Sequence, residues 1–329
     1  MTKRTSIIDV AKEAGVSIAT VSRVFNENSY VSGELTQKVL RAADKLNYKP
    51  SRLAQSLRRG RSKTVGFLVP DIVNPFFSSI VEGASEVLNS KDYVSIVCSS
   101  SVDASRETDL LETLRLSGID GLVTVLMEKY NSYIDELMTR GLPVVIVDEI
   151  IKTRNVCCVA SDNYGGMKRL MRFLLNTGHR SFAFLGGNPS TFSAQQRMKA
   201  FRDSLRNETE ASVDILTGEY TFESGYKMTR DLERVPQAIV CGNDLIAFGA
   251  MCFLKERGFS IPADVSVTGF DDVIFSKMSD PPLTTVRQDP YLMGQTAAEM
   301  LLRQFNGGIP DSIRLLETEL VMRRSTCGR

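Results

Sequence analysis

"SIIDVAKEAGVSIATVSRVFN", residues 6–26, contains two short helical patterns with a glycine between them. Ser6 can cap the first helix and Gly15 can close it. The inner face of this helix is expected to consist of Ile8, Val10, Ala11 and Ala14. The second helix, capped by Ser17, is expected to face the first with Val21, Val24 and Phe25. Two short helices joined by a turn that contains a glycine predict a helix-turn-helix.

A third helix is predicted from "SGELTQKVLRAADKLNY", residues 32–48. Ser32 can cap its start, and Pro50 is expected to end it. Its apolar residues recur at helical spacing and are Leu35, Val39, Ala42, Ala43 and Leu46. These three helices form the all-α N-terminal domain that we expect over residues 1–50.

The second helix has side chains that suit the major groove of DNA. Ile18 and Ala19 allow close approach to base edges, Ile18 can touch a thymine methyl, and Arg23 can form two hydrogen bonds with a guanine. Hydroxyl groups and the N-terminus of the helix can bind phosphates. The predicted DNA contacts of this helix are Ser17, Ile18, Ala19, Thr20, Ser22, Arg23 and Asn26. A three-helix module that binds protein is the alternative interpretation.

Charge is distributed unevenly along the chain of 329 residues, which has a net charge of +1. Residues 1–63 contain 13 Lys and Arg against 5 Asp and Glu, a net charge of +8, which leaves −7 for the remainder. A basic segment next to an acidic body indicates a polyanionic partner for that segment, with a solvated charged surface as the alternative.

The segments "DVAKEAGVSIATVSRVFN" and "VSGELTQKVLRAADKLNYKPSRLAQSL" resemble the DNA-binding head and hinge of the lac repressor/galactose repressor family of bacterial transcription regulators. In that family the two residues after the cap, here Ile18 and Ala19, read bases, and the following arginine, here Arg23, contacts guanine. The resemblance implies a sequence-specific regulator, expected to be a repressor of carbohydrate-related genes, that binds a near-palindromic operator in double-stranded DNA.

Residues 51–63 are expected to link this head to the rest of the chain. A helix of one or two turns is too short to be stable alone in water, so we expect it to fold only on DNA. The resemblance implies that two such hinges pair in the minor groove, where Leu57 would wedge between base steps and Arg58 would lie near phosphates. A linker residue that packs on the body is the alternative for Leu57.

From residue 64 to 329, apolar strand patterns alternate with amphipathic helical patterns in two successive rounds. The first round contains "TVGFLVP", "YVSIVC", "GLVTVL" and "PVVIVD", and the second contains "VCCVASDN", "SFAFLGG", "VDILTGE", "AIVCGND" and "VSVTGFDD". This pattern predicts two doubly wound α/β lobes with parallel sheets. The resemblance implies the fold of a periplasmic sugar-binding protein, with crossovers between the lobes.

Polar residues follow several of these strands, where ligands bind in open α/β sheets. Carboxylates and amides suit a neutral polyhydroxylated ligand because its hydroxyl groups can donate to their oxygens. Helix capping is the alternative role for each single aspartate. The resemblance implies a small effector, a sugar or sugar derivative, in contact with Phe76, Phe77, Asp148, Ser193, Arg197, Tyr220, Asn243, Asp271 and Gln288. Lys199, Ala200 and Pro290 depart from the family pattern, which puts the identity of the ligand in question.

The sequence also favours a cytoplasmic homodimer without enzymatic activity. It has no signal peptide, no apolar run long enough to span a membrane and no leucine-heptad tail. The six cysteines and the single histidine, His179, lack the spacing of a metal site, so reduced thiols and no cofactor are expected. Common nucleotide-binding and hydrolase motifs are missing. The alternatives are a regulator that depends on a corepressor or a phosphoprotein, a sugar-active enzyme, and a free sugar-binding protein.

Overall fold

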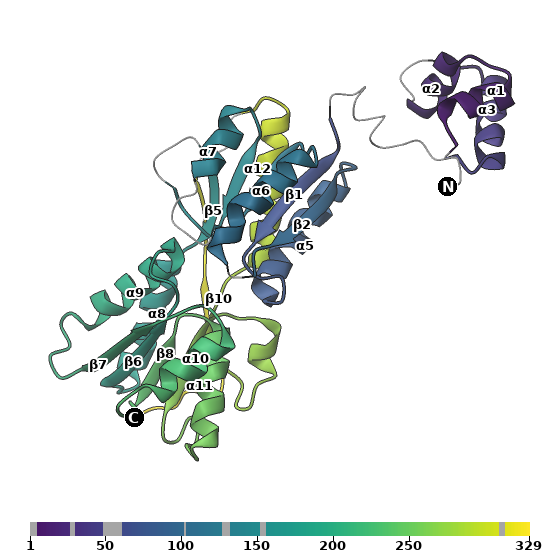
Figure 1. Cartoon of the computed structure of the whole chain (residues 1–329). Helices are drawn as coiled ribbons and strands as arrows, with labels where there is room; N and C mark the ends of the chain where they lie inside the picture. Colours follow the sequence, from purple (N-terminus) through teal and green to yellow (C-terminus); the bar gives the residue numbers. More distant parts are fainter. Residues whose placement is uncertain are drawn as a thin grey trace. The chain divides into compact units, whose positions relative to one another are not determined.

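The computed structural model divides into two compact units, residues 1–63 and 64–329 (Figure 1). It describes residues 5–26, 30–48, 61–101, 103–126, 132–151, 156–308 and 313–329. In this described part, no helix is both long and apolar enough to cross a membrane.

The first unit contains the three predicted helices, α1 (Ile7–Ala14), α2 (Ile18–Asn26) and α3 (Gly33–Lys45). Ser6 and Asp9 form a capping box at the start of α1: the Asp9 carboxylate accepts the Ser6 backbone N–H at 2.9 Å, and the Asp9 N–H donates to Ser6 Oγ. Gly15 ends the helix with a φ of 67°, a conformation that a residue without Cβ adopts readily.

The core of this unit consists of Val10, Ala11, Val21, Val39, Ala42 and Ala43. Two predicted core residues are instead at the surface, since Ile8 is 60% exposed and Leu35 is 37% exposed. Ile7 packs on the core where Ile8 was expected, because Ile7 is the residue spaced by three, four and seven positions from Val10, Ala11 and Ala14. Ser32 occupies the N-cap position of α3 without a side-chain hydrogen bond to the helix.

The second unit has two six-stranded sheets, each forming the centre of a lobe. The first sheet has the order β11-β5-β4-β3-β1-β2 and the second β12-β10-β9-β8-β6-β7. Pairing is parallel throughout, except that β12 runs antiparallel to β10. The strands are β1 (Thr64–Val69), β2 (Val94–Ser99), β3 (Gly121–Thr124), β4 (Val144–Val147), β5 (Cys157–Ser161), β6 (Ser181–Gly186), β7 (Ser212–Thr217), β8 (Ala238–Cys241), β9 (Ser266–Asp271), β10 (Thr284–Arg287), β11 (Ile313–Leu316) and β12 (Glu319–Val321).

Helices cover both faces of each sheet, which buries the apolar strands as expected for parallel sheets. The helices of the first lobe are α5 (Pro75–Asn89), α6 (Glu107–Leu116), α7 (Ser132–Thr139) and α12 (Pro290–Phe305), and α5 packs against α12. Those of the second lobe are α8 (Asn163–Asn176), α9 (Phe192–Leu205), α10 (Phe222–Arg230) and α11 (Asp244–Glu256). Two 3₁₀ turns, Ala104–Arg106 and Ile274–Lys277, complete the fold.

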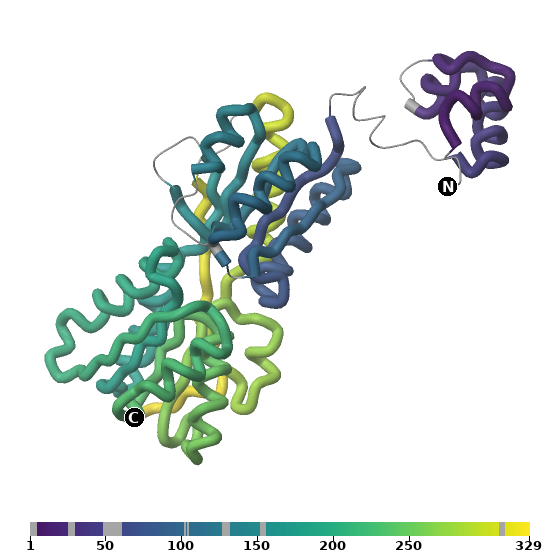
Figure 2. Tube along the Cα trace, in the orientation of Figure 1, coloured from purple at the N-terminus to yellow at the C-terminus, as the bar shows by residue number. Residues whose placement is uncertain are grey.

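The chain passes between the lobes three times. It leaves the first lobe after β5, returns after β10 to form α12 and β11, and ends in the second lobe with β12. Figure 2 shows this last part of the chain, in yellow, running along both lobes. The two predicted α/β lobes are confirmed, but the strand Cys157–Ser161 belongs to the first sheet and not to the second round. The strands β10, β11 and β12 were not predicted: β10 contains two threonines and an arginine instead of an apolar run, β11 is largely exposed, and β12 is only three residues long.

All six cysteines lie in described segments and none of them forms a disulfide; Cys157, Cys158 and Cys241 are buried. His179 is also buried, and its Nε2 lies 2.9 Å from the hydroxyl of Ser266. This contact joins the turn before β6 to the start of β9 and is structural.

Candidate functional site

The exposed side of α2 carries the residues that we expect to read DNA. Ser17, Ile18, Ala19 and Arg23 are exposed, and Ile18 is 43% exposed despite its apolar side chain. The Ser17 hydroxyl caps the helix by accepting the Thr20 backbone N–H at 3.1 Å. Val21 on the opposite side is fully buried, so the core fixes which side of α2 faces outward. Thr20 and Ser22 are half-buried at the edges of this surface.

The hinge prediction falls on residues that lie outside the described part of the chain. Leu57 and Arg58 belong to residues 49–60 and have no structural account here. Asn26 ends α2, but its side chain is also outside the description.

A cavity opens between the two lobes at the carboxyl ends of their strands. It encloses about 560 Å³ of empty space, part of which is open to solvent. Four of the nine predicted effector residues line it: Phe77, Asp148, Ser193 and Tyr220. The other lining residues are Pro70, Asp71, Asn74, Val125, Leu126, Glu149, Asn188, Thr191, Glu219 and Thr221. Its position at the carboxyl ends of parallel strands is typical of a small-molecule site.

Phe76 does not line this cavity. Its side chain is 3% exposed and belongs to the core of the first lobe, where its ring contacts that of Phe77 at a centroid distance of 5.3 Å. Phe76 therefore packs against Phe77, and the structure does not place it where it could contact an effector in this cavity.

Arg197 lies beside the cavity and is held by several protein groups. Its Nε donates to Asn163 Oδ1 at 2.8 Å and its Nη1 donates to the Gly242 carbonyl at 2.6 Å. Its guanidinium stacks on the ring of Phe270, 3.9 Å from the centroid, and lies 3.7 Å from Asp271 Oδ1. Since the side chain is only 3% exposed, Arg197 organises the floor of the site.

Asp148 is the lining residue with the most unusual electrostatic environment. Burial raises the pKa of its carboxyl to about 6, against a smaller lowering by the charge of Arg197. Its Oδ1 is buried without a hydrogen-bond partner among the described residues. Its backbone has a φ of 63°, which is strained for a residue with a Cβ. A strained, unsatisfied acceptor in a cavity indicates a ligand contact.

Asp271, Gln288 and Asn243 form the remainder of a buried polar layer. Burial raises the pKa of Asp271 well above its usual range, with Arg197 opposing this effect. Gln288 donates its Nε2 to Asp271 at 2.7 Å, which leaves Gln288 Oε1 buried and unpartnered among the described residues. Asn243 caps α11 by accepting the Ile246 N–H at 2.9 Å, and its Nδ2 lies 3.5 Å from the Tyr220 carbonyl. Burial also raises the pKa of Tyr220 to about 12.

Glu149 was not among the predicted site residues, although it follows Asp148 directly. Its carboxylate is 3% exposed and accepts the Phe192 backbone N–H, at 2.7 Å to Oε1 and 2.9 Å to Oε2. This contact joins the first lobe to the first residue of α9 in the second lobe. Adjacent acidic residues after a strand are a sequence signal, but only the packing of the lobes reveals the partner.

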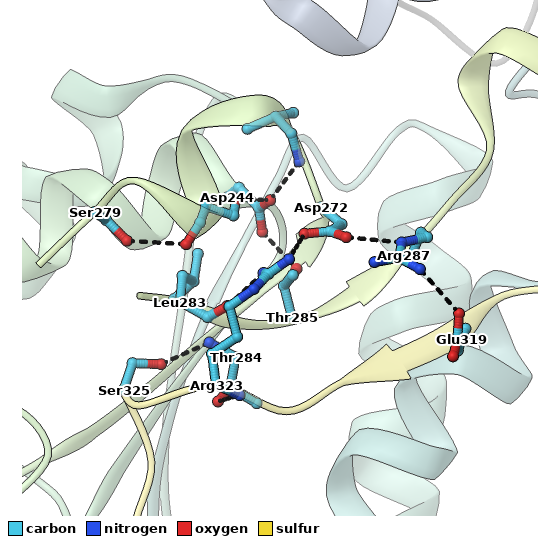
Figure 3. Close-up of polar contacts among 12 residues, drawn as sticks. Asp244, Asp272, Ser279, Leu283, Thr284, Thr285, Arg287, Glu319, Arg323 and Ser325 are labelled. Atoms are coloured by element: carbon cyan, nitrogen blue, oxygen red, sulfur yellow. Dashed lines mark hydrogen bonds and ion pairs between the residues drawn. The ribbon is translucent and has the colours of Figure 1, made fainter. Parts of the chain in front are cut away.

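Charged pairs hold the end of β9 beside the last crossovers (Figure 3). Asp272 accepts Arg287 Nε at 2.8 Å and also pairs with Arg323, while Arg287 pairs with Glu319 at 3.1 Å. The buried carboxylate of Asp244 accepts from the Thr285 hydroxyl at 2.6 Å and the Val273 N–H at 2.9 Å. These contacts fix the turn at Asp271 and Asp272, whose φ angles are 120° and 58°.

Comparisons with known proteins cover the whole chain. Residues 6–51 match the family described as bacterial regulatory proteins, lacI family, and residues 171–326 match a periplasmic binding protein-like domain. The HTH-type transcriptional regulator RegA of Clostridium saccharobutylicum is 35% identical over 98% of this chain and 99% of its own length. The ribose operon repressor of Halalkalibacterium halodurans is 33% identical over 98% of both chains.

Among solved structures, the lac repressor dimer bound to operator and the anti-inducer ONPF superimposes with a TM-score of 0.88 at 29% identity. The match covers 99% of this chain and 100% of that one. The predicted helix-turn-helix and two α/β lobes are thus confirmed, and with them a DNA-binding transcriptional regulator that a small effector controls. The chain belongs to the lacI family of bacterial regulatory proteins.

Proposed function

We propose that this regulator represses genes of carbohydrate use as a cytoplasmic homodimer, and that a neutral sugar bound between the lobes sets its affinity for operator DNA. The observation that carries the sugar assignment is Asp148 Oδ1, a buried acceptor at the cavity with no hydrogen-bond partner among the described residues. A sugar hydroxyl group can donate to it. Ribose is the first candidate because a ribose operon repressor is similar over nearly the full chain.

On the DNA side, we assign base contacts to Ile18, Ala19 and Arg23, and phosphate contacts to Ser17, Thr20 and Ser22. The exposure of Ser17, Ile18, Ala19 and Arg23 supports this assignment. Asn26, Leu57 and Arg58 are assigned by resemblance alone. The working units are residues 1–50 for DNA binding, 51–63 for the hinge and 64–329 for effector binding and dimerisation.

The remaining effector contacts are assigned to Phe77, Ser193 and Tyr220 at the cavity, with Arg197, Asn243 and Asp271 as the layer that supports them. Binding of the effector would close the lobes. This closure would change the fraction of dimers whose two hinges can pair on DNA. A coupling of about 1–3 kcal/mol is the usual scale, and it is reciprocal, so operator must change effector affinity by the same factor.

Two other functions remain as alternatives. A regulator that needs a corepressor or a phosphoprotein would use the same fold, and it would bind operator more tightly when that partner is added. A sugar-active enzyme would turn over the sugar. No such activity is part of this proposal, because none of the assigned residues places a nucleophile beside a base.

The test begins with selection of operator fragments from the source genome by the full-length protein. Operator affinity is then measured by fluorescence anisotropy with ribose and other neutral sugars. We expect a near-palindromic site and a change in affinity of about 5- to 150-fold with one sugar, which corresponds to the coupling above. Operator binding that no sugar changes, but that a phosphoprotein or a nucleobase changes, would replace this proposal with the first alternative.

A further inference from the structure

At four helices around the interlobe cavity, a side chain of the chain itself takes one of the N-terminal N–H groups. Free N–H groups at such ends are the usual binding sites for phosphate in α/β folds. Here each of four helices has a cap whose side-chain oxygen accepts a backbone N–H. These caps are Asn74 for α5, Thr191 for α9, Thr221 for α10 and Asn243 for α11.

At α9 a second N–H group is satisfied by a residue of the opposite lobe. Thr191 Oγ1 accepts the Ala194 N–H, and both carboxylate oxygens of Glu149 lie within 2.9 Å of the Phe192 nitrogen. A carboxylate at the positive end of a helix dipole forms a charge-assisted hydrogen bond. Glu149 therefore occupies the position that a phosphate or carboxylate of a ligand would take.

The charged side chains that line the cavity, within the described part of the chain, are all acidic: Asp71, Asp148, Glu149 and Glu219. The nearby cation, Arg197, is already engaged by Asn163, the Gly242 carbonyl and Asp271. An anionic ligand would therefore meet like charges on the side chains that line the cavity. By contrast, Asp148 Oδ1 is buried and has no hydrogen-bond partner among the described residues, so it can accept from a hydroxyl.

We propose that Glu149 is a selectivity residue, which occupies the N-terminus of α9 and restricts the effector to uncharged polyhydroxyl compounds, to the exclusion of their phosphate esters and acids. This inference rests on the proposed function and names the class of ligand that the same site accepts. Shortening the side chain at this position frees the Phe192 N–H and converts the end of α9 into an anion site.

The first test uses inorganic phosphate, so it does not depend on the identity of the effector. Full-length wild type, Glu149→Ala and Glu149→Gln are titrated with phosphate at constant ionic strength while the Phe192 amide resonance is followed. We expect phosphate to cause a saturable shift of the Phe192 amide resonance in Glu149→Ala and no shift in wild type. Glu149→Gln keeps an acceptor for the Phe192 N–H, so its resonance should shift only weakly. Glu233→Gln, which removes an exposed acid of the second lobe that does not line the cavity, is the control and should behave as wild type.

The second test compares ribose with ribose 5-phosphate, and glucose with glucose 6-phosphate, by calorimetry. Wild type should bind the free sugar about tenfold or more tightly than its phosphate ester, the scale expected when a like charge is placed in a desolvated site. In Glu149→Ala this ratio of affinities should be smaller. Phosphate binding at Phe192 in wild type, or a preference of wild type for the phosphate ester, overturns the inference. If phosphate behaves as expected but no free sugar alters operator affinity, the role of Glu149 stands and the sugar assignment fails.

Discussion

Asp271, the last residue of β9, accepts a hydrogen bond from Gln288, the first residue after β10, at 2.7 Å. The chain leaves the second lobe for α12 of the first lobe just beyond Gln288. This one contact therefore joins the buried carboxylate beside Arg197 to a segment on which the relative position of the lobes depends.

Gln288→Leu should weaken both the fold and the effector response. The substitution removes the donor to Asp271 and leaves a buried acceptor with one partner fewer, which costs about 1–3 kcal/mol. It also removes Oε1, a buried acceptor of the polar layer beside Arg197, and we expect the effector response to weaken with it. Urea unfolding and sugar titrations of the operator complex check the two effects. Unchanged unfolding together with an unchanged sugar response would refute the assigned role of Gln288.

Asp148→Asn should stabilise the free protein at pH 7 and impair effector binding. Burial raises the pKa of Asp148 to about 6, so at neutral pH the fold carries a disfavoured charge. A rise of about two pKa units from the usual value sets an upper limit of about 3 kcal/mol for the gain. Thermal unfolding at pH 7 should show a higher midpoint, while calorimetry should show weaker sugar binding.

The same group predicts a pH dependence with a definite sign. Between about pH 4 and 6 the native state holds a proton on Asp148 that the unfolded state has released, so this group makes stability fall as pH rises through that window. The difference in unfolding free energy between Asp148→Asn and wild type should therefore grow from pH 4 to pH 6. Asp244, whose pKa burial also raises to about 6, remains in both proteins and cancels in this comparison. A constant difference across this range contradicts the shifted pKa.

Asp272→Asn should destabilise the second lobe by about 1–3 kcal/mol, since the 8%-exposed carboxylate has two arginine partners, Arg287 and Arg323. Lys255→Ala is the matched control: its partner Asp280 has a side chain that is 96% exposed, and such surface pairs contribute about 0–1 kcal/mol. Urea unfolding of both variants measures the contrast. An equal loss of unfolding free energy in the two variants would show that the ion pairs of Asp272 stabilise the protein no more than a surface pair does.

Arg23→Ala should weaken the free energy of operator binding by about 1–3 kcal/mol per half-site. It should also reduce the preference for one particular base pair in each half-site. Lys38→Ala, on α3, is the control because its partner is the exposed Glu34 and no base contact is assigned to it. Affinity measured against a set of operator variants at one salt concentration tests this. An unchanged base preference would remove Arg23 from the readout.

Much of the DNA-binding unit could be predicted from the sequence because its signals are local. The caps Ser6 and Ser17, the turn at Gly15 and the apolar spacing are all read within a few residues. Only the packed structure showed that Ile8 and Leu35 are exposed: Ile7 takes the core position in α1, and Leu35 lies in the first turn of α3, at the edge of the core.

The sequence by itself determined that a basic helix-turn-helix precedes two rounds of strand and helix, because caps, charge and periodicity act between near neighbours. Only the tertiary structure decided which sheet β5, β10, β11 and β12 join, and that Glu149 meets Phe192, 43 residues away and in the other lobe. Such pairings depend on how distant segments pack, and no local propensity encodes them. The cavity, with its capped helix ends and its unpartnered acceptors, exists only once that packing is complete.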